Sequence, residues 1–139
     1  MNDLQMAIDG LDGHTICLCK DGRIITSDKR GIAPMADFIS EQRDMRGYSA
    51  ADLIVGKAAA LLFVKAGIKA VFAQTVSLGG LETLRRYGVP CSYGEVTDFI
   101  VNRQGTDICP MERAVQGVND PDEAYARICA QMSELKKAR

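Results

Sequence analysis

The segment from Asn102 to Glu112 is the densest group of side chains that could perform chemistry. Pro110 suits the first position of a helix, so Cys109 would precede that helix and face its unpaired backbone N–H groups. Such a position stabilises a thiolate, so Cys109 could be a nucleophile and Glu112 its proton-transfer partner or a reciprocal cap. The alternative is a turn in which Cys109 is a small buried residue and Glu112 caps its own helix.

Lys57 is a second candidate, because it is the only charged residue in the apolar run from Leu53 to Val64. A helix that is apolar on all sides is buried, so its cation must reach solvent, pair with an acid or contact a ligand. Asp52 lies five residues earlier, too far for good pairing on one helical face. The sequence therefore supports two interpretations, a ligand contact or a lysine that reaches solvent at the helix edge.

Other patterns of ligand binding are incomplete. Gly56-Lys57 is not a phosphate loop, because the earlier glycine is missing and Ala58 stands where a serine or threonine is required. Ser77-Leu78-Gly79-Gly80 joins a strand to a helix and is either an anion-binding turn or a flexible connection. His14 is the only histidine, and the chain has no Cys-x-x-Cys pair, so the ligands of a tetrahedral zinc site are not supplied. We expect no metal and no cofactor.

Hydrophobic periodicity predicts the elements that position these side chains. Asp21-Gly22 predicts a tight type I′ turn between two strands, at 14–19 and 23–26. The other predicted elements are helices at 2–10, 31–40, 50–66 and 81–87, strands at 69–75 and 91–96, and a last helix that begins at Asp120; residues 97–104 fit either a short helix or an extended segment. This order predicts one α/β domain over 1–139, a three-layer α/β/α sandwich with a mixed sheet.

Composition excludes several functional classes. The chain has 17 Lys and Arg against 18 Asp and Glu, and it contains no large basic block, so we expect no nucleic-acid partner. The longest apolar run has twelve residues, whereas a membrane span needs about 20, so we expect no membrane partner. The first residues show no secretory signal, and the five cysteines are read as free thiols in a reducing cytoplasm.

Four runs together resemble a small prokaryotic family known only as a domain of unknown function, number eighteen ninety-three. They are Cys-Leu-Cys-Lys-Asp-Gly at 17–22, Ser-Asp-Lys-Arg-Gly-Ile-Ala-Pro at 27–34, Val-Gly-Lys-Ala-Ala-Ala at 55–60, and Asn102-Arg103 through Cys109-Pro110-Met111-Glu112. The resemblance covers roughly residues 14–125 and implies a cytidine-deaminase-like fold.

The resemblance does not extend to zinc chemistry. Active deaminases carry His/Cys-Ala-Glu at the start of a buried helix and Pro-Cys-x-x-Cys at a later helix start. The corresponding regions here, 52–58 and 77–80, contain neither Cys nor His. A zinc-dependent deaminase is therefore not expected, and whether the chain is an enzyme of another kind stays open. The residues expected around the former pocket are Asp52, Lys57, Asn102, Arg103, Cys109 and Glu112.

Three functional hypotheses follow. The first is metal-independent binding of a nucleoside, a nucleotide or another anionic metabolite, with positive charge from Lys57 and Arg103, hydrogen bonds from Asn102, and any chemistry from Cys109 with Glu112. The second is a cysteine-dependent enzyme that uses Cys109. The third is a protein-interaction or homo-oligomerisation module, with its interface at the edge of the hairpin or on the last helix.

Overall fold

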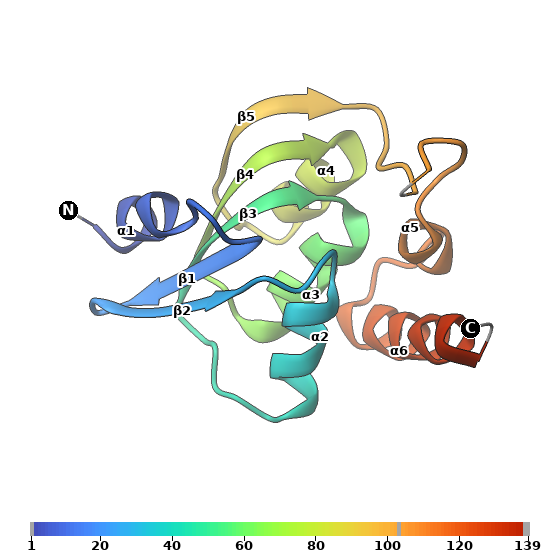
Figure 1. The fold of residues 1–139 in the computed structure, drawn as a ribbon, viewed down its shortest axis with the longest axis horizontal. Coiled ribbons are helices and arrows are strands. Elements are labelled where there is room, and N and C mark those ends of the chain that lie inside the picture. Colours follow the sequence, from blue (N-terminus) through green and yellow to red (C-terminus); the bar gives the residue numbers. More distant parts are fainter. Residues whose placement is uncertain (1, 103, 138–139) are drawn as a thin grey trace.

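The computed structural model describes residues 2–102 and 104–137, and this part of the chain forms one mixed sheet covered by helices on both faces (Figure 1). The sheet has five strands in the order β2-β1-β3-β4-β5. The elements are α1 (Asp3–Gly10), β1 (Ile16–Lys20), β2 (Arg23–Ser27), α2 (Ala33–Ser40), β3 (Ser49–Val55), α3 (Lys57–Ala66), β4 (Ala70–Ser77), α4 (Leu78–Arg86), β5 (Cys91–Thr97), α5 (Pro110–Ala114) and α6 (Pro121–Lys137). The predicted mixed-sheet α/β class is confirmed.

The first two strands form the hairpin that the sequence predicts. Asp21 and Gly22 both have positive φ, 51° and 79°, which is the backbone geometry of a type I′ turn. The turn sets an antiparallel register in which Ile16 faces Ser27 and Lys20 faces Arg23.

The other half of the sheet is parallel. β3 runs antiparallel to β1 but parallel to β4, and β4 is parallel to β5. The carboxyl ends of β3, β4 and β5 therefore meet at one edge of the sheet, and in Figure 1 their arrowheads point towards the loop that carries α5. We call this edge the carboxyl edge; open α/β sheets bind their ligands at such edges.

Two hydrophobic cores hold the layers together. The larger core lies between the sheet and the helices α2 to α6. The smaller core lies under α1 on the opposite face and contains Ala7, Leu11, Cys17, Cys19 and Ala51. Cys17 and Cys19 therefore share the face of β1 that lies under α1, and burial raises the pKa of both thiols.

The predicted helix at 50–66 is wrong over its first half. Residues 49–55 form β3, and α3 begins only at Lys57, after Gly56. β3 lies between β1 and β4 with a helix layer on each side, so most of its side chains are buried, on both faces, and they do not alternate in polarity. Lys57 therefore stands at the first position of a helix rather than in its middle.

The remaining segments follow the predictions more closely. α6 begins after Asp120, whose carboxylate accepts a hydrogen bond from the Glu123 amide at 2.8 Å. Residues 98–102 and 104–109 form a loop with one isolated bridge between Val101 and Ile108, so the described residues of 98–104 form no helix, in keeping with the extended alternative; position 103 lies outside the described residues. No helix within 2–102 and 104–137 is both long and apolar enough to cross a membrane.

Candidate functional site

The start of α3 is capped by a carboxylate from a distant part of the chain. Glu112, in α5, accepts a hydrogen bond at Oε1 from the Lys57 amide and another at Oε2 from the Ala58 amide, both at 2.8 Å. These amides belong to the first turn of α3, where an N–H group has no acceptor within the helix. Glu112 therefore places a negative charge at the positive end of the helix dipole. It caps α3, and not its own helix.

Gly56 provides the space that this carboxylate occupies. Its backbone is extended, with φ −101° and ψ −171°, so glycine is not required here for its conformation. A Cβ at this position would lie only 2.6 Å from the carboxyl carbon of Glu112. Any larger residue would therefore displace Glu112 from the start of α3.

The start of α4 packs directly against the start of α3. A Cβ at Gly80 would lie 2.9 Å from the Val55 carbonyl oxygen, and a Cβ at Gly79 would lie 3.6 Å from the Cβ of Lys57. The Ser77 hydroxyl caps α4 by accepting a hydrogen bond from the Gly80 amide at 3.0 Å. The sequence regions 52–58 and 77–80, which correspond by position to the two deaminase motifs, thus meet at Gly56 and Gly80.

This junction does not fit a zinc ion. Around it the two regions supply backbone N–H donors and the side chains of Lys57 and Ser77, which do not form a set of metal ligands. The one carboxylate that reaches it, Glu112, already accepts two amide hydrogen bonds. Across the described ranges, no three His, Cys, Asp or Glu side chains cluster closely enough to hold a metal ion.

Exposed apolar side chains also occur near the carboxyl ends of the three parallel strands. Ile54 near the end of β3, Leu78 after β4 and Phe99 after β5 are 54 %, 53 % and 54 % exposed. The Lys57 side chain is half-buried, and within 2–102 and 104–137 it forms no ion pair. The edge therefore combines an unneutralised cation with exposed apolar side chains, a combination that the sequence pattern did not reveal.

The loop over this edge contains two more predicted residues. Asn102 organises the loop itself, because its Oδ1 accepts from the Thr106 amide at 3.0 Å and its Nδ2 donates to the Thr106 hydroxyl at 3.2 Å. Cys109 precedes α5, as its place before Pro110 predicts, and its thiol makes no capping hydrogen bond. The reactivity of Cys109 stays a prediction. Arg103 lies outside the described residues.

Asp52 is separated from this group. It lies within β3, opposite Ile16 of β1 and Ala73 of β4, three residues before the strand ends. Only 7 % of the residue is exposed, and this burial raises the pKa of its carboxyl to about 8, although the amides of Ile54 and Leu53 partly oppose the shift. The structure thus brings Lys57 and Glu112 together and places Asp52 deeper in the sheet.

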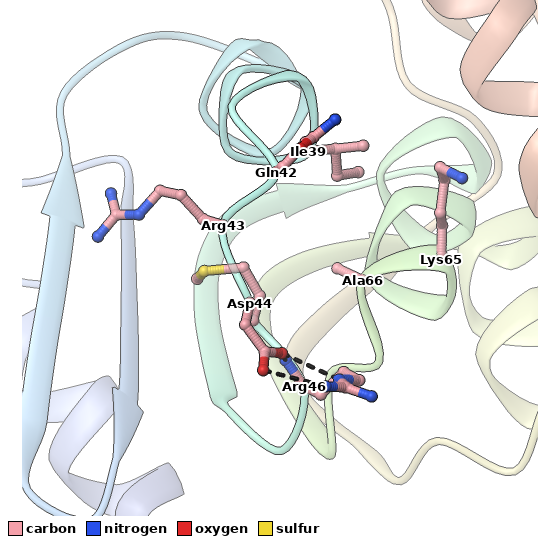
Figure 2. Close-up of a pocket in the computed structure, with 8 residues that line it drawn as sticks. Ile39, Gln42, Arg43, Asp44, Arg46, Lys65 and Ala66 are labelled. Atoms are coloured by element: carbon pink, nitrogen blue, oxygen red, sulfur yellow. Dashed lines mark hydrogen bonds and ion pairs between the residues drawn. The ribbon is translucent and has the colours of Figure 1, made fainter.

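A depression of about 250 Å³ lies at the other end of β3, next to the loop that precedes it (Figure 2). Two of its cations are neutralised: Arg46 pairs with Asp44 at 3.0 Å, and Lys65 pairs with Asp122 at 2.6 Å. The Arg46 contact lowers the pKa of Asp44 to about 2. A third cation, Arg43, stacks on the Phe38 ring and points away from Lys65. This depression therefore offers little to an anion.

The fold and the junction define a class, an α/β sandwich whose deaminase-motif positions carry no metal ligands. The chain belongs to the family described as a domain of unknown function (DUF1893), whose model matches residues 10–132. The crystal structure of a DUF1893 family protein from Thermotoga maritima is similar over 94 % of this chain and 90 % of that one, with 26 % identity and a TM-score of 0.85. These findings confirm the family that the resemblance names, and the Thermotoga maritima structure shares the α/β fold of this chain.

A weaker similarity concerns a protein of stated activity. A diaminohydroxyphosphoribosylaminopyrimidine deaminase/5-amino-6-(5-phosphoribosylamino)uracil reductase, also from Thermotoga maritima, matches 81 % of this chain and 40 % of its own, with 16 % identity and a TM-score of 0.48. No curated protein matches the sequence.

Proposed function

We propose that this protein is a metal-independent small-molecule-binding domain whose site lies at the carboxyl edge, where α4 begins beside Lys57. Its ligand is an anionic metabolite with an apolar or aromatic part, such as a nucleotide. The proposal is supported by one contrast, between the two helix starts that meet at this edge.

The contrast is electrostatic. The amides of Lys57 and Ala58 at the start of α3 already donate hydrogen bonds to the Glu112 carboxylate, so they are not available to bind an incoming anion. The start of α4 has a serine cap but no acidic residue in its first turn. A helix start of this kind attracts anions through its N–H groups and its dipole. The stem of Lys57 lies next to Gly79, so the ammonium can reach the same anion.

The apolar side chains suit the rest of such a ligand. Ile54, Leu78 and Phe99 are exposed at the same edge, where they can cover one face of a ring. Ligand sites combine apolar surface with a few polar groups that fix orientation. Asn102 adds little to this recognition, because its side-chain amide is engaged with Thr106.

The test is a thermal-shift screen with inorganic phosphate, ribose 5-phosphate, AMP and adenosine, on four proteins. Besides the wild type these are Lys57→Met, Gly79→Asp and Gly79→Ala. A ligand at 100 times its Kd stabilises by about 2.7 kcal/mol, which raises the Tm by roughly 5–10 °C in a domain of this size. We expect AMP to raise the Tm of the wild type more than phosphate or adenosine does.

The Gly79 variants are a matched pair. Asp at position 79 places a carboxylate at the start of α4, where it stabilises the helix but repels an anion, so the free protein keeps its Tm and the AMP shift disappears. Ala at 79 adds only a methyl group at ordinary contact distance from Lys57, so the AMP shift is retained. The proposal is wrong if no compound shifts the wild type, or if Gly79→Asp and Lys57→Met respond as the wild type does.

A further inference from the structure

A second depression lies on the other face of the sheet, against the end of α1, and has a volume of about 460 Å³. Its apolar lining comes from Ile8 and Leu11 of the α1 region and from Leu53 and Phe72 of β3 and β4. Its polar rim comes from Asp12, His14 and Gln74. The larger core, with α3 and α4, lies across the sheet from it, so this depression is separate from the proposed anion site.

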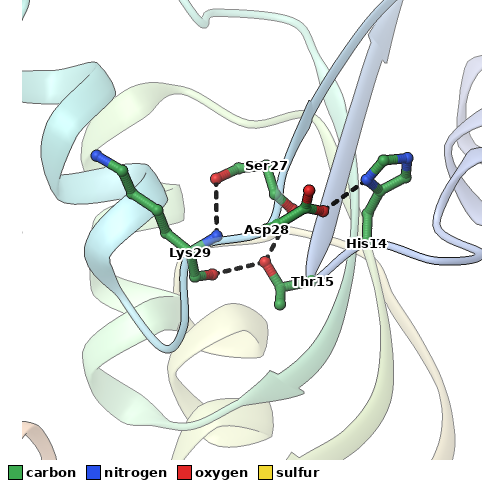
Figure 3. A network of polar contacts seen from close by, with 5 residues as sticks. All are labelled: His14, Thr15, Ser27, Asp28 and Lys29. Carbon is green, nitrogen blue, oxygen red and sulfur yellow. Dashed lines mark hydrogen bonds and ion pairs between the residues drawn. The ribbon is translucent and has the colours of Figure 1, made fainter.

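The histidine on this rim is held by a carboxylate. His14 Nδ1 lies 2.7 Å from Asp28 Oδ1, and Figure 3 shows the other ring nitrogen turned away from Asp28. The segment around Asp28 is fixed by Thr15, whose single O–H is shared between the carbonyl oxygens of Ser27 and Lys29, at 2.9 and 2.6 Å from its Oγ1. When the ring is neutral and donates Nδ1–H to Asp28, Nε2 carries the lone pair and can accept a hydrogen bond.

The charges around the depression select its occupant. Asp12 contributes a carboxylate, His14 is backed by the carboxylate of Asp28, and no Lys or Arg is among the described residues that line it. Such a rim repels anions and favours neutral or cationic molecules with N–H donors. The side chains of Leu53 and Phe72, which are half-buried, offer an apolar surface for a ring.

We propose that this depression binds a small aromatic molecule that carries an amino or amidino group. The ring packs on Leu53 and Phe72, while the N–H groups donate to His14 Nε2 and Asp12. Asp28 is a positioning residue, because it touches the ligand only through the histidine that it orients. The run from Ser27 to Pro34, which carries part of the family resemblance and has no role in the carboxyl-edge site, contains this residue.

The test is NMR titration of the full chain with benzamidine and, as a control of the same shape and opposite charge, benzoate. We expect benzamidine to shift the amide signals of residues 12–14, 53 and 72–74 at concentrations up to about 10 mM, and benzoate to leave them unchanged. Gln74→Lys, a change of an exposed side chain, adds a cation to the rim and should weaken benzamidine binding by about tenfold or more. Equal shifts with both compounds, or no shift with benzamidine, would overturn the proposal.

A second measurement tests whether Asp28 orients the His14 ring or only stabilises the surrounding segment. His14 is the only histidine, so its ring nitrogens give unambiguous signals in a long-range 1H–15N spectrum. The neutral wild-type ring should be the Nδ1–H tautomer, and Asp28→Asn should lose this preference together with part of the benzamidine affinity. An Nε2–H tautomer in the wild type would contradict the role of Asp28. Lys57→Met and Gly79→Asp should bind benzamidine as the wild type does, so this proposal and the carboxyl-edge site can fail independently.

Discussion

At the scale of single residues, Glu112 shows how far a sequence can be read. Its place one turn after Cys109 suggested a proton-transfer partner or a cap of its own helix, but its carboxylate binds the amides of Lys57 and Ala58. Glu112 and Lys57 are 55 positions apart in the sequence, and no local rule of spacing links positions so distant. Gly56 was the available hint, because a glycine before a helix can make room for a close contact.

Removal of the Glu112 carboxylate should destabilise the fold. Glu112→Ala leaves two half-buried amides of α3 without their acceptor and removes a favourable charge–dipole interaction. The cost of a lost cap is about 1–2 kcal/mol, and two unsatisfied donors extend the range to about 3 kcal/mol. Urea denaturation should show this loss as a lower midpoint at an unchanged slope. Glu112→Gln keeps one acceptor oxygen and should fall between the two proteins.

A double-mutant cycle with Gly56 provides the control. Gly56→Ala alone forces its new methyl group against the Glu112 carboxylate, so we expect a loss of stability of about 1–3 kcal/mol. Once Glu112 is already alanine, this overlap is gone and the same change should cost much less. Strictly additive effects would show that Gly56 and Glu112 act independently, contrary to the structure.

Asp52 gives a prediction about pH. Burial raises the pKa of its carboxyl to about 8, whereas an unfolded aspartate titrates near 3.9. Between about pH 4 and pH 8 the folded state therefore holds a proton that the unfolded state has released, so the free energy of unfolding falls as the pH rises. Asp52→Asn cannot ionise and should be more stable than the wild type at pH 8–9, by on the order of 2–4 kcal/mol.

The same pair of proteins supplies the control for Asp52. Near pH 4 the carboxyl is protonated in the folded state, so the two stabilities should converge. Asp44 and Asp107 have lowered pKa values and lose stabilising contacts in acid. This loss of stability is the same in both proteins, so it does not affect the difference between them. A stability difference that does not change between pH 4 and pH 9 would show that Asp52 does not titrate in this range.

At the scale of elements, the hairpin and most of the helices could be predicted because their rules are local. Asp21-Gly22 sets its turn through positive φ, and Asp120 caps α6 within three residues. The sequence predicts a helix where β3 lies, for two reasons. Ser49-Ala50-Ala51-Asp52 resembles a capping box, and the segment lacks the alternation of polar and apolar residues that marks a half-exposed strand. A strand buried on both faces has no periodicity of its own, so only its partners β1 and β4 define it.

Two adjacent glycines test how α3 and α4 meet. Gly80→Ala would bring a methyl group within 2.9 Å of the Val55 carbonyl oxygen, a backbone atom that cannot move aside cheaply. We expect a loss of about 1–3 kcal/mol in the free energy of unfolding. Gly79→Ala meets only the Lys57 Cβ at 3.6 Å and should be neutral or gain up to about 1 kcal/mol from helix propensity. Equal effects at both positions would contradict the close approach of the two helices.

At the scale of the whole molecule, the two edges of the sheet differ. β2 forms one edge and begins with Arg23, which faces Lys20 across the hairpin, so charged side chains, including Asp21 of the turn, flank this end of the edge. β5 forms the other edge, contains no Lys or Arg, and is exposed over its five central residues. Its single charge, Glu95, already accepts a hydrogen bond from the Thr75 hydroxyl at 2.9 Å. An exposed edge strand with few charged side chains is a template for pairing with another chain.

We therefore expect homo-oligomerisation to use β5 rather than the hairpin edge or the last helix. Two copies of β5 that pair antiparallel about Gly94 would place Ser92 opposite Val96 and Tyr93 opposite Glu95, with no like charges facing each other. Light scattering after size exclusion should give a dimer at micromolar concentration, and Val96→Lys should give a folded monomer with an unchanged circular dichroism spectrum. A wild type that stays monomeric at millimolar concentration would contradict the prediction. A Val96→Lys protein that still dimerises would show that the interface does not use the edge of β5.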